Sequence, residues 1–211
     1  MKFVFFITFI TALLFIQGEA ELRQDFRDFL NLVPRRRIGY IAARHYIVDE
    51  QFRTTFRYLQ SSRFHQNWSK IRNSQEFLDL IDYIRMQDVS LAALQDVASV
   101  IDKLPNQLRT FRIPAKVPVM MMMQRNLVSF MREVMQALPR ARFSSLMARK
   151  VTEGGDFARL YKAVQQKEFK QLLDKAKASG NLQSSWLELR KHNIEVNDLI
   201  DMAYEIISWG P

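Results

Sequence analysis

The sequence predicts an all-α fold built from two tandem helical repeats. Three observations lead to this prediction. Apolar residues recur with the three- and four-residue spacing of amphipathic helices, no stretch sustains the alternation typical of a strand, and a segment of the first half recurs 105 positions later. Glycine is scarce, and Pro105, Pro114 and Pro118 fall between the two halves, as expected of a linker.

The first element is a predicted secretory signal peptide over residues 1–20. A lysine precedes the apolar run Phe3–Ile16, which has the length of a signal core and is short for a transmembrane helix. Gly18 and Ala20 supply the small residues of a cleavage site. We therefore expect a secreted mature chain that begins near Glu21; an uncleaved membrane anchor is the alternative.

The internal repeat is carried by two segments that align without a gap, Asp28–Phe64 and Glu133–Phe169. Equivalent pairs include Pro34 and Pro139, Arg35 and Arg140, Arg37 and Arg142, Ile41 and Leu146, Phe52 and Phe157, Phe56 and Tyr161, and Phe64 and Phe169. Further along the chain we align Met86–Ser90 with Asn193–Asn197, which moves the offset to 107. Shared proline, arginine and aromatic positions in one gap-free run indicate a duplication.

Each repeat is expected to contain a series of helices. The first apolar stripe, Leu22–Val33, ends at Pro34, which cannot continue a helix. Five further stripes follow in the first repeat: Ile38–Tyr46, Phe52–Leu59, Phe64–Ile71, Phe77–Ile84 and Leu91–Leu104. Asp49, Asn73 or Ser74, and Ser90 are the expected N-caps, because their side chains can accept a backbone N–H. The second repeat runs through the same pattern to Ile207 and Trp209.

The mature chain divides into repeat 1 (residues 21–113), a linker (114–123) and repeat 2 (124–211), which we expect to form one domain. Four consecutive methionines, Met120 to Met123, lie where the linker enters repeat 2. They cannot all lie on one helix face, since successive residues are about 100° apart. Methionine fills irregular gaps. We therefore expect either a segment buried between the repeats or one wall of a ligand-holding interior.

The composition restricts the function. The chain has no cysteine, so disulfides cannot stabilise it and it must bury apolar surface instead. Its formal net charge is +9, but export and the absence of a recognisable nucleic-acid module argue against a nucleic-acid partner.

Catalytic and metal-binding motifs are lacking. The three histidines, His45, His65 and His192, show no metal-ligand spacing. In the repeat alignment His45 and His65 fall on lysines, and we interpret them as solvated positions. The Gly154–Gly155 pair is interpreted as a turn. A Ser-His-Asp set assembled in space stays open at this stage, but we predict no enzyme activity, no metal and no cofactor.

Two arginine clusters follow equivalent prolines: Arg35, Arg36 and Arg37 after Pro34, and Arg140 and Arg142 after Pro139. We predict that they contact anionic membrane surfaces; a solvated face that keeps the protein soluble is the alternative. Asn67-Trp68-Ser69 matches the N-glycosylation triplet, which makes Asn67 a glycosylation candidate, although Trp68 continues a helical stripe.

The first repeat resembles the insect allergen-repeat family, which includes the cockroach major gut allergen and mosquito midgut microvillar-type proteins. The residues that carry the resemblance are Asp25, Phe26, Phe29, Leu30, Leu32, Val33, Pro34, Ile38, Ile41, Asp49, Phe52, Tyr58 and Leu59. The second repeat departs from the pattern where Met131, Val134 and Gly154 replace Phe26, Phe29 and Asp49. The first two replacements keep apolar character, so the architecture is expected to hold while the cavity shape changes.

The resemblance implies an all-α capsule in which the two repeats enclose a large apolar cavity for fatty acids or phospholipids. The implied function is a secreted, monomeric midgut lipid-binding protein of the gut lumen or microvillar surface, tied to digestion. Our cavity candidates are Phe26, Phe29, Ile41, Phe52, Phe56, Ile81, Ile84, Val97, Ile101, Met121, Met131, Val134, Leu146 and Leu160, each chosen from a helical stripe; ordinary core packing is the alternative for each. Two other functions stay open: cytolytic disruption of cell or enveloped-virus membranes, and detoxification as a specifier protein.

Overall fold

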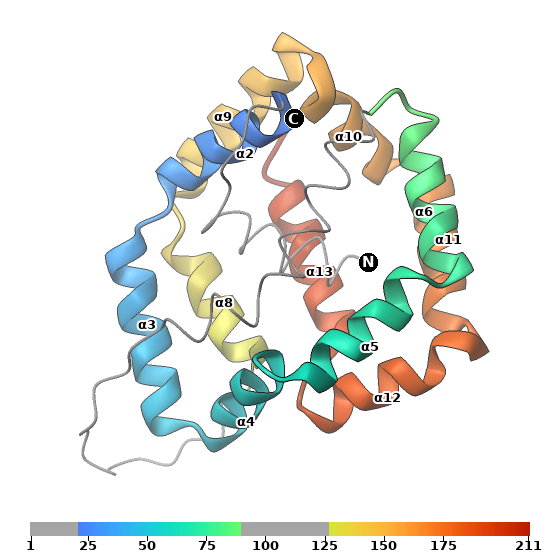
Figure 1. Ribbon diagram of the computed structural model, residues 1–211. Coiled ribbons are helices and arrows are strands. Elements are labelled where there is room, and N and C mark those ends of the chain that lie inside the picture. The colour runs from blue at the N-terminus through green and yellow to red at the C-terminus, as the bar shows by residue number, and fades with distance from the viewer. Residues whose placement is uncertain (1–20, 90–126) are drawn as a thin grey trace.

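The computed structural model describes residues 21–89 and 127–211, which are helical and contain no strand (Figure 1). The helices of repeat 1 are α2 (Glu21–Leu32), α3 (Arg35–Val48), α4 (Glu50–Leu59), α5 (Ser62–Arg72) and α6 (Gln75–Arg85). Those of repeat 2 are α8 (Leu127–Ala137), α9 (Arg140–Glu153), α10 (Gly155–Gln165), α11 (Lys167–Ala178), the short 3-10 turn η1 (Gly180–Leu182), α12 (Gln183–Lys191) and α13 (Val196–Ile207). The predicted all-α class is confirmed, and none of the helices described in these two ranges is long and apolar enough to cross a membrane.

Helix starts in repeat 1 follow local side-chain chemistry. Asp49 accepts a hydrogen bond from the Phe52 N–H, as predicted, and Ser74 accepts one from Phe77, which decides between the two residues expected at that start. Ser61 caps α5 in the same way, a cap that sequence inspection missed. The predicted cap Ser90, like the sixth stripe of repeat 1 and the four methionines, lies outside the described residues.

The turns correct one detail of the repeat alignment. Asp88 and Asn193 both adopt the left-handed conformation, with φ of 59° and 57°. Asp and Asn tolerate this region better than most residues, and the residues that follow them, Val89 and Ile194, are both buried. These positions are 105 apart, so the offset of 107 proposed for this stretch is wrong. The Gly154–Gly155 turn is confirmed, since it separates α9 from α10 with φ of 87° at Gly154.

The two repeats are interleaved. The first helix of each repeat packs on the second helix of the other, which pairs α2 with α9 and α3 with α8. Later helices repeat this arrangement, with α5 on α12 and α6 on α11. Figure 1 shows these pairs framing a central region in which α13 lies, and α13 contacts α8 and α12. A repeat taken alone would therefore expose the faces that the other repeat covers.

The main core is shared by both repeats. Phe29 of α2 is fully buried and packs on Phe143 and Phe157 of repeat 2, with ring centroids 5.7 Å and 5.2 Å away. Burying one such phenyl ring stabilises the fold by about 1.5–3 kcal/mol. A smaller cluster joins α3 to α8 through Ile41 and Val134. Both clusters thus contain residues of the two repeats in contact with each other.

Candidate functional site

The predicted cavity residues within the described ranges all face the interior clusters. Phe26, Phe29, Phe52, Ile84, Met131, Leu146 and Leu160 are buried in the main core, and Ile41 and Val134 in the smaller one. Phe56 and Ile81 are partly buried against the main core. Val97, Ile101 and Met121 lie outside the described residues. A large enclosed cavity therefore stays a prediction, while the apolar, inward character of these stripes is observed.

A small open pocket lies on the outside of repeat 2, among α11, α12 and α13. It has a volume of about 120 Å³, and Trp186, Ile194 and Val196 are among its lining residues. Ligand sites usually measure about 300–1,000 Å³. This pocket is smaller than that range.

Polar side chains tie the interleaved helices together, first between α3 and α8. His45, which is fully buried, places Nε2 2.7 Å from Glu133 Oε2, and Arg44 pairs with the other oxygen of the same carboxylate. The Arg44 hydrogen bond is the main reason that the pKa of Glu133 lies below its usual value. The His45 ring also packs against Phe52 and Phe130, at 5.6 Å and 5.5 Å. The imidazole is thus held by a hydrogen bond to Glu133 and by two neighbouring phenyl rings.

The equivalent interface between α2 and α9 carries a second ion pair. Lys150 Nζ lies 2.7 Å from Asp25 Oδ1 and 2.7 Å from Asp28 Oδ2. In the alignment Lys150 is equivalent to His45, and Asp28 to Glu133. Both interfaces therefore place a cationic or protonatable group of one repeat on an acid of the other.

This geometry corrects the interpretation of two aligned positions as solvated. His45 is fully buried and the Lys150 side chain is only 13% exposed. His65 and its equivalent Lys170, in contrast, are exposed as expected. The helical period marks polar positions, but it does not show which of them face the other repeat.

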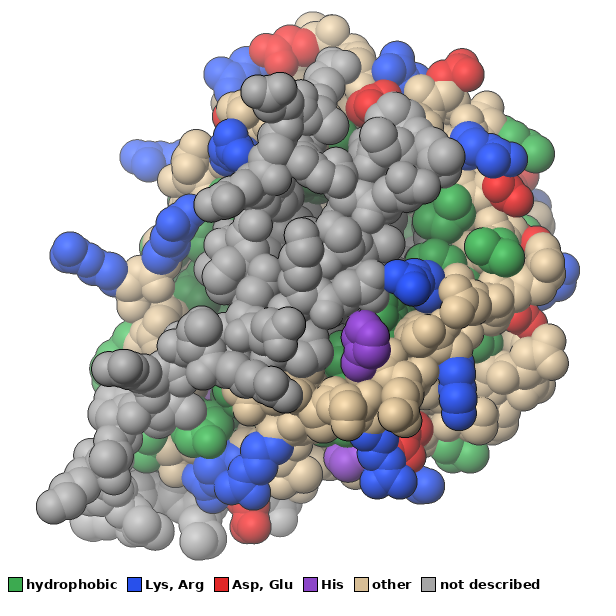
Figure 2. Space-filling model, viewed as in Figure 1, with side chains coloured by type: hydrophobic (Ala, Val, Ile, Leu, Met, Phe, Trp, Pro, Cys, Tyr) green, Lys and Arg blue, Asp and Glu red, His purple; other side chains and the backbone are tan. Residues whose placement is uncertain are grey.

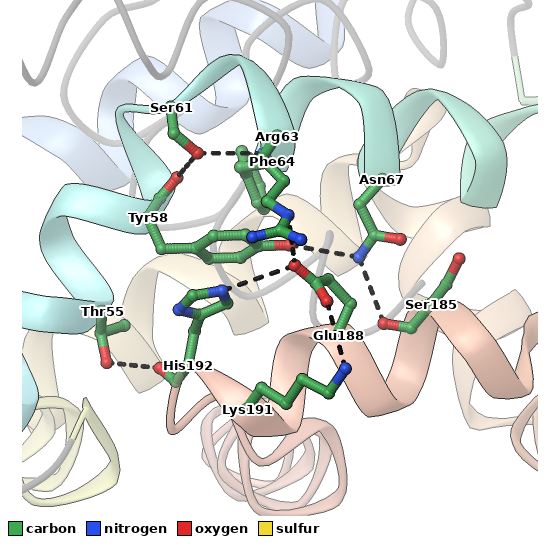
Figure 3. Close-up of polar contacts among 10 residues, drawn as sticks. All are labelled: Thr55, Tyr58, Ser61, Arg63, Phe64, Asn67, Ser185, Glu188, Lys191 and His192. Atoms are coloured by element: carbon green, nitrogen blue, oxygen red, sulfur yellow. Dashed lines mark hydrogen bonds and ion pairs between the residues drawn. The ribbon is translucent and has the colours of Figure 1, made fainter.

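A third polar interface lies between α4, α5 and α12 (Figure 3). The Tyr58 ring stacks on His192 with centroids 3.8 Å apart and planes 9° apart. Thr55 Oγ1 donates a hydrogen bond to the His192 carbonyl at 2.6 Å. Glu188 Oε1 lies 3.5 Å from His192 Nε2 and 3.0 Å from Arg63 Nε. Burial raises the pKa of the Tyr58 hydroxyl. The Tyr58 ring thus joins repeat 1 to His192 of repeat 2.

Asn67 completes this third interface. Its side-chain amide donates to the Ser185 carbonyl at 3.1 Å and to the Tyr58 hydroxyl at 3.3 Å, and the residue is only 7% exposed. The folded chain therefore does not present Asn67 to solvent, which disfavours the predicted glycosylation. At the equivalent interface the two positions are Leu172 and Leu80. The polar network is thus a property of one interface and not of the repeat.

The polar side chains of the three interfaces hold helices of the two repeats against each other. His192 Nδ1 has no hydrogen-bond partner in the described part of the chain. No group of three or more potential metal ligands occurs among the described residues. The only sequence signal for these interfaces was the alignment of His45 with Lys150, whose significance depends on the interleaving.

The predicted membrane-contact residues lie at two helix starts. Arg35, Arg36 and Arg37 open α3, and Arg140 and Arg142 open α9. All five are exposed, and Figure 2 shows several Lys and Arg side chains on the same side of the molecule, at the upper left.

Comparison with known proteins agrees with this architecture. Residues 21–200 match the family described as "Insect allergen related repeat, nitrile-specifier detoxification". The chain is also similar to "Protein G12" of Anopheles gambiae, with 22% identity over 193 residues that cover 90% of this chain and 88% of that protein. Because the family match spans nearly the whole helical part, the chain belongs to the insect allergen-related repeat family.

Proposed function

We propose that this protein is a non-enzymatic lipid carrier that holds fatty acids or phospholipids between its two repeats. The observation that carries the proposal is the interleaving of helices. The α2–α9 and α3–α8 pairs turn the apolar faces of both repeats toward one shared interior (Figure 1). An apolar interior with few polar groups is the usual environment of a bound lipid.

The polar interfaces support this role. Each joins a helix of repeat 1 to a helix of repeat 2 and lies between helices that frame the interior. Because an ion pair fixes the relative position of two helices, such contacts keep the helices around the interior in place. The apolar interior then contacts the lipid without requiring one orientation of it. The proposed site of action is the insect midgut, after export, in keeping with the predicted signal peptide and the family.

The first test is to purify the secreted protein without detergent, extract it with organic solvent and identify the extract by mass spectrometry. We expect stoichiometric fatty acid or phospholipid. The delipidated protein is then titrated with a brominated fatty acid and, as a matched control, with the same acid lacking bromine. Trp68 and Trp209 are 2% and 7% exposed. In a Trp186→Phe variant, tryptophan fluorescence that is quenched by the brominated acid and not by the control acid would therefore show that the acyl chain lies in the interior. Absence of lipid together with absence of quenching would refute the proposal.

A matched pair of variants on α6 localises the ligand. Ile81 is partly buried against the core, whereas Leu78 on the same helix is 44% exposed. Ile81→Gln is expected to weaken fatty-acid binding several-fold, and Leu78→Gln to leave it unchanged. Circular dichroism establishes that both variants keep their helices. Equal effects of the two changes would place the ligand outside the interior.

A further inference from the structure

The two arginine clusters, 105 residues apart in the sequence, come together in the fold. The end of α3 lies beside the early part of α8, because His45 contacts Phe130 and Glu133. The two helices are therefore antiparallel, and the start of α3 lies beside the end of α8 (Figure 1). Since α9 begins only three residues after α8, at Arg140, both clusters lie at the same end of this helix pair.

The charge of this surface is not neutralised. Arg35, Arg36, Arg37, Arg140 and Arg142, which we call the arginine face, form no ion pair with any described residue, and Arg140 lies 5.6 Å over the ring of Trp209. The first turns of α3 and α9 contain no acidic residue, and neither helix has a side-chain cap. Helix N-termini carry partial positive charge, so arginine there is electrostatically unfavourable in the isolated protein. An anionic partner would reverse the sign of this interaction.

An exposed aromatic side chain accompanies the charge on repeat 1. Tyr40, one turn beyond Arg36 and Arg37 on α3, is 70% exposed, which is unusual for a large apolar residue. The equivalent position in α9 is Ser145. Tyrosine is enriched where one end of the ring meets hydrocarbon and the hydroxyl meets water, as at a bilayer surface. Basic residues next to such a ring are typical of an interfacial contact.

We propose that the arginine face docks the protein on anionic phospholipid bilayers, with Tyr40 entering the headgroup region. Anionic bilayers fit better than a soluble anion, because five exposed cations from two helices and one apolar ring match an extended charged surface. Docking would place the carrier where its lipid is collected or released. It does not depend on the proposed function, because attachment is measured whether or not the interior holds a lipid.

The test is flotation of the purified protein with vesicles of phosphatidylcholine and with vesicles in which part of it is replaced by phosphatidylserine. Binding is expected only to the anionic vesicles and should fall when salt is raised from about 0.1 M to about 1 M, where the screening length drops from about 10 Å to about 3 Å. Each arginine near the surface is worth about five-fold in affinity, so replacing Arg35, Arg36 and Arg37 by Gln should cost on the order of 100-fold. Replacing Arg140 and Arg142 by Gln should cost roughly 25-fold.

The control is a charge-matched variant in which Arg57, Lys162 and Lys167, exposed residues of α4, α10 and α11, become Gln. It should bind like the parent protein. Tyr40→Ser should weaken binding even at high salt, whereas Leu78→Ser should not. Equal binding to both vesicle types, or equal losses in the matched triple variants, would overturn the proposal.

Discussion

Lys150 is the residue whose replacement tests the interleaving of the two repeats most directly. Its Nζ lies 2.7 Å from carboxylate oxygens of both Asp25 and Asp28, and the Lys150 and Asp25 side chains are 13% and 10% exposed. Burial alone would lower the pKa of Lys150, but hydrogen bonds to the two carboxylates outweigh it, so the pKa is raised. Lys150→Met keeps the aliphatic chain and removes the charge.

The size of the effect follows from the burial of the group. Removing one member of a buried ion pair costs about 3–5 kcal/mol, because the other charge stays buried without a partner. Asp28 is 28% exposed, so water replaces part of the lost interaction. We therefore expect the free energy of unfolding to fall by about 2–3 kcal/mol. At about 2–4 °C per kcal/mol for a chain of this size, Tm should fall by about 4–12 °C.

The assay is differential scanning calorimetry at neutral pH, with Lys162→Met on α10 as the exposed-lysine control, expected to change stability by less than about 0.5 kcal/mol. Because the folded-state pKa of Lys150 is raised, its contribution is complete below the unfolded value of about 10.4 and is lost only as pH rises through the folded value. On the alkaline side, the Tm difference between parent and variant should therefore persist until strong alkali. Lys150→Met and Lys162→Met unfolding at the same temperature would refute the reasoning.

Three further predictions follow from individual contacts. Glu133→Gln should lower Tm at neutral pH and have no effect in acid. A hydrogen bond from Arg44 lowers the pKa of Glu133, so the stability that this contact provides is lost as pH falls below about 4.3 and through the folded-state pKa. Thermal unfolding followed by circular dichroism at both pH values checks this. Asn67→Leu removes the donor to the buried Ser185 carbonyl and should cost about 1–3 kcal/mol in urea unfolding, while intact mass of the secreted parent protein should show no glycan on Asn67. Gly154→Ala, at φ 87°, should cost about 1–2 kcal/mol by the same urea measurement, whereas Gly180→Ala, which has open space around it, should be near neutral.

Sequence reasoning located the helices because their signals are local. The stripe that ends at Pro34 and the caps at Asp49 and Ser74 depend on residues no more than a few positions apart, and all are found in the structure. The repeat was recognisable because equivalent residues kept their spacing over Asp28–Phe64. The alignment was wrong only around Asp88, where the shared feature is a left-handed backbone conformation and the offset of 105 in fact continues.

The polar interfaces were not predictable in the same way. His45 and Lys150 follow the spacing of polar helix positions, and such positions usually face water. They are buried because the second helix of each repeat lies on the first helix of the other. The paired residues are 88 positions apart for His45 and Glu133 and 125 for Lys150 and Asp25. A triplet such as Asn67-Trp68-Ser69 likewise gives no sign that its amide is already hydrogen bonded to Ser185.

The sequence by itself determined the helices, their order, the duplication and the membership of a repeat family, because periodicity, capping and recurrence are properties of neighbouring or aligned residues. Only the tertiary structure decided which faces meet. It paired Lys150 with Asp25, enclosed His45 beside Glu133, and brought the arginines of two distant helix starts to one surface. The physical reason is that an amphipathic helix specifies that its apolar face be buried, while the choice of covering partner depends on the packing of the whole chain.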